Sequence, residues 1–471
     1  MRWTVKLELT TDDGKTQVSE VGSILRSSSD LQPEEVGLTL EEGRLLLRDI
    51  ECRLVADQVY AYTMSWRRCP HCGSQQYFKD MRTKCVRTVH EAYRFRGRRI
   101  RTCSCLTREG FPEAFFPLGD LIPRRTTPEL RYLFAELGAR MPYREASTVL
   151  RLFGFSAEGT GRMTILRHTA ALGQVIDTQR RNAAVQVFDA DFSATRGASV
   201  SIDDTFVRHC RRDPGRQIKV TAGRIERDGK LAERFAFVAS APRHYPDHFE
   251  GILREAQIGP GAEIRVFTDG DDGLRNFVRR WVGSEIVQQL DWFHIGMRIE
   301  HLRSAANLPM TYGDFLYRRD ALDPLQKRID RIREALWRGK PWRAMVNLRR
   351  LHHDAVRWLR PRRDHGGHAR KRIESVISDF ARYIRGIRRA VPNFARARAA
   401  GQRISTSHVE SVMNHLINHR MSKKQQMRWS PEGAHLLLQV RADLLNGTLT
   451  DRFRQVHTRF RGPPIYVSAR S

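Results

Sequence analysis

The stretch VFTDGDDG, residues 266–273, places Asp269 at the end of a short apolar run with the character of a β-strand. A second such run, SIDDTFVRH at 201–209, contains Asp203. Around them the sequence predicts strands at 198–207, 216–226, 234–240, 263–269 and 285–291, and helices at 246–256 and 272–282. Three strands followed by helix-separated strands predict an α/β fold, in which an antiparallel meander gains parallel strands at its edge.

A third acidic position follows far along the chain. The segment SHVESVMNHLINHR, residues 407–420, places Glu410 at the start of a run with helical spacing. Two strand-borne aspartates and a helix-borne glutamate are the rigid oxygen ligands that a two-metal phosphoryl-transfer site needs, and they favour Mg²⁺ or Mn²⁺. Each residue alone is also typical of a turn or a helix cap. Strand alternation puts only one of Asp203 and Asp204 on a given face, which leaves that choice open.

The charge of the chain indicates a polyanionic partner. The 471 residues carry 82 Lys+Arg against 53 Asp+Glu, a formal net charge of +29. The excess is concentrated at 301–400, with 25 Lys+Arg against 9 Asp+Glu, which predicts a surface for phosphate backbones. No apolar stretch reaches the length of a membrane helix, and the N-terminus MRWTVKLELTTDDGKT lacks the apolar core of a signal peptide. We therefore expect a cytoplasmic protein that does not bind membranes.

Five of the seven cysteines lie between residues 69 and 105, which indicates metal binding rather than a disulfide framework. The motifs CPHC (69–72) and CSC (103–105) each supply two thiolates, and four thiolates satisfy a structural, tetrahedral Zn²⁺. The predicted ligands are Cys69, Cys72, Cys103 and Cys105. Cys85, His71 and His90 remain alternative ligands.

Helical spacing then runs from 127 to 176, interrupted by GFSAEGTG at 154–161. Two helices around this break, the second carrying Arg162 and Arg167, are consistent with a DNA-binding helix-turn-helix. An ordinary helical hairpin explains the same pattern equally well.

Four segments together carry a family resemblance: VSIDDTFV, VFTDGDDGLRNF, LDWFHIGMRIEHL, and the run that begins SHVESVMNHLINHRMSKKQQMRW. They resemble the catalytic domain of DDE transposases of bacterial insertion sequences, in the branch related to Mutator and hAT elements. The resemblance covers residues from about 195 to 450. It implies a ribonuclease-H-like core with a large helical insertion before the last glutamate, and Asp203, Asp269 and Glu410 as catalytic metal ligands. It also implies a D-x-x-H signature at Asp291 and His294, with a role that supports the site.

The patterns along the chain, together with the resemblance, predict six parts. The expected parts are an N-terminal α+β segment (1–65), a zinc ribbon (66–118), a helix-turn-helix (125–178), the first part of the core (195–304), a basic helical insertion (305–400), and the core completion with C-terminal helices (401–471).

The implied activity is metal-dependent DNA cleavage and strand transfer at the terminal inverted repeats of a bacterial mobile element, by a homo-oligomer on double-stranded DNA. Lys423, Lys424 and Arg428 would then lie near the DNA end held at Glu410. Two alternatives are a non-catalytic DNA-binding regulator that uses the zinc ribbon and helix-turn-helix, and a nuclease of the same core fold that never joins strands.

Overall fold

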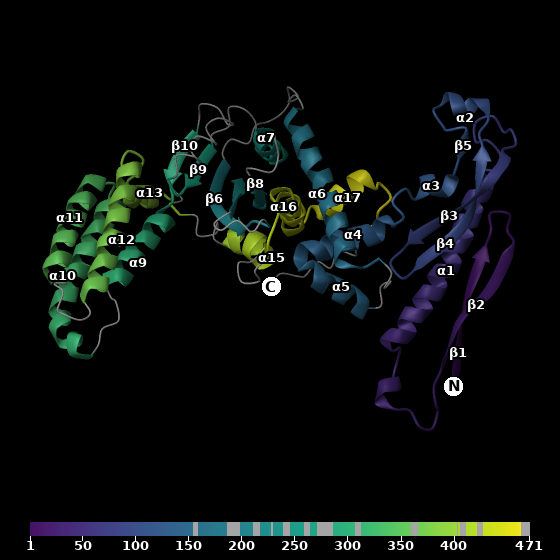
Figure 1. Cartoon of the computed structure of the whole chain (residues 1–471), viewed down its shortest axis with the longest axis horizontal. Coiled ribbons are helices and arrows are strands. Elements are labelled where there is room, and N and C mark those ends of the chain that lie inside the picture. The colour runs from purple at the N-terminus through teal and green to yellow at the C-terminus, as the bar shows by residue number, and fades with distance from the viewer. Residues whose placement is uncertain are drawn as a thin grey trace. The chain divides into compact units, whose positions relative to one another are not determined.

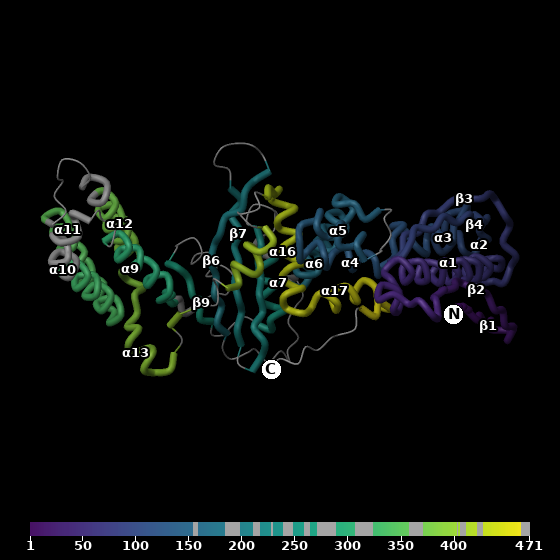
Figure 2. Tube along the Cα trace, turned by 90° about the horizontal axis from the view of Figure 1, so that it is seen from below, coloured from purple at the N-terminus to yellow at the C-terminus, as the bar shows by residue number. Residues whose placement is uncertain are grey.

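The structure is a computed structural model, and its helices and strands are shown in Figures 1 and 2. The chain divides into two compact units: unit 1 is Met1–Gln174 with Gly447–Ser471, and unit 2 is Val175–Asn446. The structure describes residues 1–153, 159–185, 198–210, 217–227, 229–238, 245–258, 264–270, 286–306, 312–358, 366–402, 404–405, 411–421 and 427–462.

Unit 1 begins with an antiparallel hairpin and a long helix. The hairpin is β1 (Arg2–Thr10) with β2 (Thr16–Leu25), and α1 (Leu40–Ser65) follows it. Thr39 caps α1 by accepting a hydrogen bond from the Glu42 amide, and the Glu42 side chain accepts one from the Thr39 amide in return.

A three-stranded antiparallel sheet follows, in the order β3 (Tyr77–Arg87), β4 (Ala92–Arg101), β5 (Ala114–Phe115). Two short helices flank β5 in the sequence, α2 (Ser104–Arg108) and α3 (Pro117–Leu121). Figures 1 and 2 both show α1 running along this sheet, and Tyr93 of β4 donates a hydrogen bond to the Arg48 carbonyl of α1.

The rest of unit 1 is helical. The helices α4 (Pro128–Arg140), α5 (Tyr143–Leu152) and the start of α6 (Arg162–Val185) surround a small core. That core contains Leu130, Phe134, Ala146, Leu150 and Ile165. The C-terminal helix α17 (Leu449–Val456) belongs to this unit, because the rings of Phe453 and Tyr132 lie 5.4 Å apart.

Unit 2 contains a five-stranded sheet in the order β10-β9-β6-β7-β8. Its strands are β6 (Ala198–Arg208), β7 (Gln217–Arg227), β8 (Glu233–Val238), β9 (Ile264–Thr268) and β10 (Ile286–Leu290). The first three form an antiparallel meander, β9 pairs parallel to β6, and β10 pairs parallel to β9. The predicted antiparallel meander with parallel strands added at its edge is confirmed. The helix predicted at 272–282 lies outside the described residues.

Two helices pack on this sheet. The helix α7 (Tyr245–Glu255) contributes Phe249, Ile252 and Leu253 to a core that also contains the apolar residues of β6 and β9. The helix α16 (Pro431–Asn446) lies beside β8, where Gln439 donates a hydrogen bond to the Ala236 carbonyl.

A helical bundle follows β10 in the sequence and precedes the C-terminal part of unit 2; Figure 1 shows it in green. It comprises α9 (Trp292–Ala306), α10 (Tyr312–Trp337), α11 (Pro341–Trp358), α12 (Gly366–Ile387) and α13 (Phe394–Ala399). The apolar residues of α12 at helical spacing, from Ile373 to Ile387, are buried in the core of this bundle. A π-helical turn, η2 (Met413–Asn418), and α15 (His419–Met421) then lead toward α16.

Candidate active site

Asp203 and Asp269 lie close together at the sheet of unit 2. Ser201 of β6 pairs with Phe267 of β9 in the parallel register, and Asp203 and Asp269 each follow two residues later. Asp203 lies within β6, whereas Asp269 comes directly after the end of β9. The charge of Asp269 acts on the Asp203 carboxyl, so the two aspartates that the sequence predicted as a pair are neighbours.

The third parallel strand adds another carboxylate nearby. Leu290 of β10 pairs with Thr268 of β9, and Asp291 and Asp269 each come next in the chain. The Asp291 amide donates a hydrogen bond of 3.1 Å to the Thr268 carbonyl, and its carboxylate Oδ1 accepts one of 2.8 Å from the Phe293 amide. Asp291 is buried, at 2% exposure, and it caps α9.

The electrostatics connect Asp203 to its neighbours. Burial raises the pKa of the Asp203 carboxyl, and the negative charges of Asp269 and Asp204 raise it further. The His294 imidazole opposes this rise. His294 lies in the first turn of α9, with Nε2 4.0 Å from Asp291 Oδ2. The D-x-x-H segment thus lies beside Asp203, where a protonated imidazole would stabilise the ionised carboxylate.

Asp204 has different partners. Its Oδ1 accepts a hydrogen bond of 2.6 Å from the Thr221 hydroxyl, and its Oδ2 lies 2.6 Å from Lys219 Nζ. Both partners belong to β7, which pairs antiparallel with β6. Asp204 is therefore held by an ion pair within the sheet, which separates its surroundings from those of Asp203.

The helical insertion contacts the Asp269 turn, which sequence reasoning missed. Tyr383 of α12 donates a hydrogen bond of 2.9 Å to the Asp269 carbonyl, and the Arg298 guanidinium lies 4.0 Å from the Tyr383 ring centroid. Burial raises the pKa of Tyr383, so its hydroxyl remains a donor. Gly270 follows at φ +95°, where a Cβ would lie 2.6 Å from Ile387 Cγ2. Tyr383 also packs against the apolar core of the bundle, so its position in the sequence does not mark it as a site residue.

Three predicted site residues, Glu410, Lys423 and Lys424, lie outside the described residues. The described helix that follows Glu410 starts at Ser411, and its Leu416 carbonyl accepts a hydrogen bond of 2.6 Å from Arg441 of α16. Arg428 is exposed, beside Trp429, whose amide donates to the Arg208 carbonyl at the end of β6.

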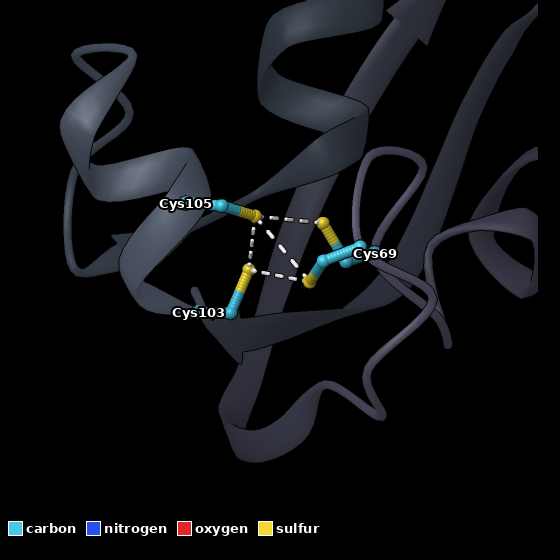
Figure 3. A group of neighbouring side chains, drawn as sticks. Cys69, Cys103 and Cys105 are labelled. Atoms are coloured by element: carbon cyan, nitrogen blue, oxygen red, sulfur yellow. Dashed lines mark hydrogen bonds between the residues drawn. The ribbon is translucent and has the colours of Figure 1, made fainter.

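The four cysteines of the two knuckles converge in unit 1 (Figure 3). Their sulfur–sulfur distances are 3.3 Å for Cys69–Cys105, 3.0 Å for Cys103–Cys105, 3.4 Å for Cys72–Cys105 and 3.7 Å for Cys72–Cys103. The Ser74 hydroxyl lowers the pKa of the Cys72 thiol. Four thiols at these distances are compatible with tetrahedral Zn²⁺.

The alternative zinc ligands do not join this group. Among the described residues the sulfur cluster contains only the four knuckle cysteines, and Cys85 lies on β3. His71 Nε2 lies 3.2 Å from the Glu109 carboxylate instead. The residues that the sequence predicted as first choice for zinc are those that the fold brings together.

A second polar cluster, unseen from the sequence, lies in the interior of unit 2. Asp177 of α6 lies with Oδ1 3.0 Å from His248 Nδ1 of α7 and 3.0 Å from His435 Nε2 of α16, and all three side chains are buried. By distance they could hold a metal. However, His435 Nδ1 accepts a hydrogen bond from the Val238 amide at 3.3 Å, which places the proton on Nε2. A metal-binding histidine normally donates from its other nitrogen, so this cluster is better described as a hydrogen-bonded network.

This network predicts a loss of stability in acid. Burial lowers the pKa of His248 to about 4, below its ordinary 6.5, so between these pH values the unfolded chain takes up a proton that the folded chain does not. The expected loss is roughly 3 kcal/mol of unfolding free energy as the pH falls from 6.5 to 4. Burial raises the pKa of the Asp177 carboxyl, but the hydrogen bonds from His248 and His435 lower this pKa by more. The stability that ionised Asp177 contributes is therefore lost at a still lower pH.

The measurement is the unfolding free energy at pH 7 and pH 4.5 for the wild type and His248→Gln. Glutamine can donate to Asp177 but does not titrate in this range, so its dependence on pH should be clearly smaller. Equal dependence in both proteins would contradict the assignment.

No family model and no curated protein matches the sequence. Among solved structures, the chain is similar to the Drosophila P element transposase strand transfer complex, at 13% identity and a TM-score of 0.24. That match covers 76% of this chain and 84% of the other. Among the described residues, no helix is long and apolar enough to cross a membrane.

Proposed function

We propose that unit 2 is the ribonuclease-H-like catalytic core of a DDE transposase, which cuts DNA at the ends of a mobile element and joins the freed ends to a target. The observation that carries this proposal is the closeness of Asp203, within β6, to Asp269, which directly follows the neighbouring parallel strand β9, with His294 near them. Residues on or directly beside rigid strands are held more accurately than residues in long loops.

The donor set fits Mg²⁺ or Mn²⁺, because Asp203, Asp269 and Glu410 offer only carboxylate oxygens. Two such ions would stabilise the attacking and leaving oxygens of an in-line phosphoryl transfer. We assign the first carboxylate to Asp203 and not to Asp204. The Asp204 carboxylate is already engaged in an ion pair with Lys219 and a hydrogen bond from Thr221. Asp291 supports the site by capping α9, and His294 by facing the charge of Asp203.

Basic residues around both units supply the contacts to double-stranded DNA. Arg162 and Arg167 are exposed on α6, as a helix that contacts DNA requires, and Arg428 is exposed beside the end of β6. We propose that Lys423, Lys424 and the basic residues of the helical insertion also contact the DNA backbone. Pairing two element ends calls for a homo-oligomer on DNA.

The test is an excision and reintegration assay. A marker is placed between the DNA ends that flank the gene, and the wild type is compared with Asp269→Asn and Glu410→Gln. Movement with the wild type alone is the expected result. Cutting without joining would favour a nuclease, and specific end binding without cutting by any variant would favour a regulator.

The Tyr383 contact gives a prediction of its own. Tyr383→Phe removes the hydroxyl that holds the Asp269 carbonyl but keeps the ring that packs in the bundle. Loss of a hydrogen bond worth about 1 kcal/mol should weaken Mn²⁺ binding and slow cleavage by about fivefold. Mn²⁺ binding is measured by calorimetry. The control is Tyr132→Phe in unit 1, which loses a similar hydrogen bond to Thr450. Unchanged Mn²⁺ affinity in Tyr383→Phe would show that the contact does not position Asp269.

A further inference from the structure

Arg298 of α9 extends the polar face that begins with the D-x-x-H segment. Asp291, His294 and Arg298 are spaced i, i+3 and i+7, and residues with this spacing share one face of an α-helix. Ile295 and Ile299 of the same helix are buried in the core of the bundle, which fixes how α9 is rotated. The fold therefore places a half-buried arginine one turn beyond His294, on the face that carries Asp291.

Tyr383 holds the Arg298 side chain next to the Asp269 turn. The guanidinium carbon lies 4.0 Å from the centroid of the Tyr383 ring, and the Tyr383 hydroxyl donates to the Asp269 carbonyl at 2.9 Å. Burial is the main cause that raises the pKa of this hydroxyl; the charge of Arg298 lowers the pKa, and the charges of Asp269 and Asp291 raise it. One cation and two carboxylates act on the same hydroxyl, so they lie close together.

Within the described part of the chain, Arg298 has no carboxylate partner. It forms no ion pair there with any acidic residue, including the two near Tyr383. Arg303, further along α9, is instead paired with Glu300 and Asp330. A guanidinium that stacks on an aromatic ring keeps its N–H donors in its own plane, where they can bind oxygens at its edge.

The ligand that suits this position is a phosphate group. The proposed function gives the oxygens of Asp203 and Asp269 to metal ions, so the partly buried guanidinium beside them needs another anion. Phosphate oxygens match the planar donors of arginine and accept short, charge-assisted hydrogen bonds from them. A DNA strand that passes the site presents further phosphates on either side of the one that reacts.

We infer that Arg298 is a substrate-positioning residue, whose guanidinium, stacked on Tyr383, binds a phosphate of the DNA strand next to the phosphodiester that reacts at Asp203 and Asp269. This inference rests on the proposed function and adds to it a group that holds the strand in place. In a second possible role Arg298 only offsets the negative charge of the aspartates, and the two roles predict different responses to a change in the DNA.

The test compares Arg298→Gln with the wild type on DNA whose phosphates are neutralised one at a time. Each duplex carries a single methylphosphonate in place of one phosphate around the junction between the element end and the flanking DNA. Binding is followed by anisotropy with Ca²⁺, which takes carboxylate oxygens as Mg²⁺ does but with a looser geometry. The matched control is Arg303→Gln, which removes the same charge from the same helix. Melting temperatures establish that the variants are folded.

On unmodified DNA, Arg298→Gln should weaken binding by about 10- to 100-fold, the range for hydrogen bonds to charged groups. At one position the methylphosphonate should weaken wild-type binding by a similar factor. It should weaken binding of Arg298→Gln there by less than about twofold, because the contact is already lost. Arg303→Gln should bind unmodified DNA within about threefold of the wild type, and should respond to every methylphosphonate as the wild type does.

Arg298→Lys keeps the charge but not the planar fork of donors. It should recover part of the affinity and show a weaker coupling to the same phosphate, and it replaces Arg298→Gln in the comparison if that variant does not fold. Equal losses for the wild type and the Arg298 variants at every methylphosphonate position would overturn the inference. Arg298 would then only offset the charge of the aspartates.

Metal binding without DNA separates substrate positioning from a structural role. Loss of a cation near the carboxylates removes a repulsion, so Mn²⁺ should bind Arg298→Gln at least as tightly as the wild type, measured by calorimetry. Weaker Mn²⁺ binding would show that Arg298 acts by holding Tyr383, and would overturn the inference.

The outcomes also separate this inference from the transposase proposal. If the wild type shows the coupling at one phosphate but never cleaves, the transposase proposal fails and the phosphate contact stands. If the wild type cleaves and no position is coupled to Arg298, the inference alone fails. Absence of DNA binding by the wild type would overturn both.

Discussion

Asp203→Asn should reduce DNA strand cleavage by about 1000-fold, the equivalent of about 4 kcal/mol of transition-state stabilisation. Asparagine preserves the size of the side chain but offers one oxygen and no charge, so it is a poor ligand for Mg²⁺. The measurement is single-turnover cleavage of a labelled element end with Mg²⁺ and with Mn²⁺. Asp269→Asn should behave in the same way, because Asp269 is the proposed second ligand of the same metal site and its charge acts on Asp203.

The next residue supplies the matched control. Asp204→Asn makes the same chemical change one position along β6, where the carboxylate is paired with Lys219 and Thr221. It should cost about 1–2 kcal/mol of stability, since it weakens the hydrogen bond and ion pair of a carboxylate that is largely buried, although Lys219 itself is partly exposed. Cleavage by the folded protein should stay within about tenfold of the wild type, or less than about 1.4 kcal/mol. If Asp204→Asn abolished cleavage and Asp203→Asn did not, the assignment would be reversed.

Cys103→Ser should release the zinc and unfold the hairpin region of unit 1. Structural Zn²⁺ contributes about 10–16 kcal/mol in small zinc domains, more than this region can recover from its own small core. Around the cluster, that core consists mainly of Leu106 and the rings of Trp66, Phe111 and Phe115. Metal analysis should fall from about one zinc per chain to near zero, and limited proteolysis should cut within 66–118.

Cys85→Ser is the control for this prediction. Cys85 lies within the same segment, on β3, but outside the sulfur cluster, so its variant should keep zinc and resist proteolysis. Loss of zinc from Cys85→Ser, or retention by Cys103→Ser, would show that the ligand set has been misassigned.

Local patterns were enough to predict much of this architecture. The alternating runs predicted the five strands of unit 2 and their directions, because strand period and connection length both constrain how a sheet is assembled. The cysteine knuckles were found in the same way, since metal ligands come in close pairs along the chain.

Other features depended on contacts between distant segments. The period of a strand shows that Asp203 and Asp204 face opposite ways, but it does not show which face Lys219 occupies. Tyr383 has the spacing of a core residue, and only its meeting with the Asp269 carbonyl, 114 residues away in sequence, gives it another role. The buried cluster of Asp177, His248 and His435 likewise joins three helices whose local sequences do not predict it.

The placement of the last described helices has a consequence for how the chain folds. The helix α16 covers β8 in unit 2, while α17 brings Phe453 against Tyr132 in unit 1. A chain still being synthesised therefore contains both aspartates, the cysteine cluster and the whole bundle before either unit can close. Until then, apolar surface of β8 and of α4 remains in water, where it is prone to aggregation and proteolysis. High contact order of this kind slows folding, so the rate at which both units are completed depends on α16 and α17.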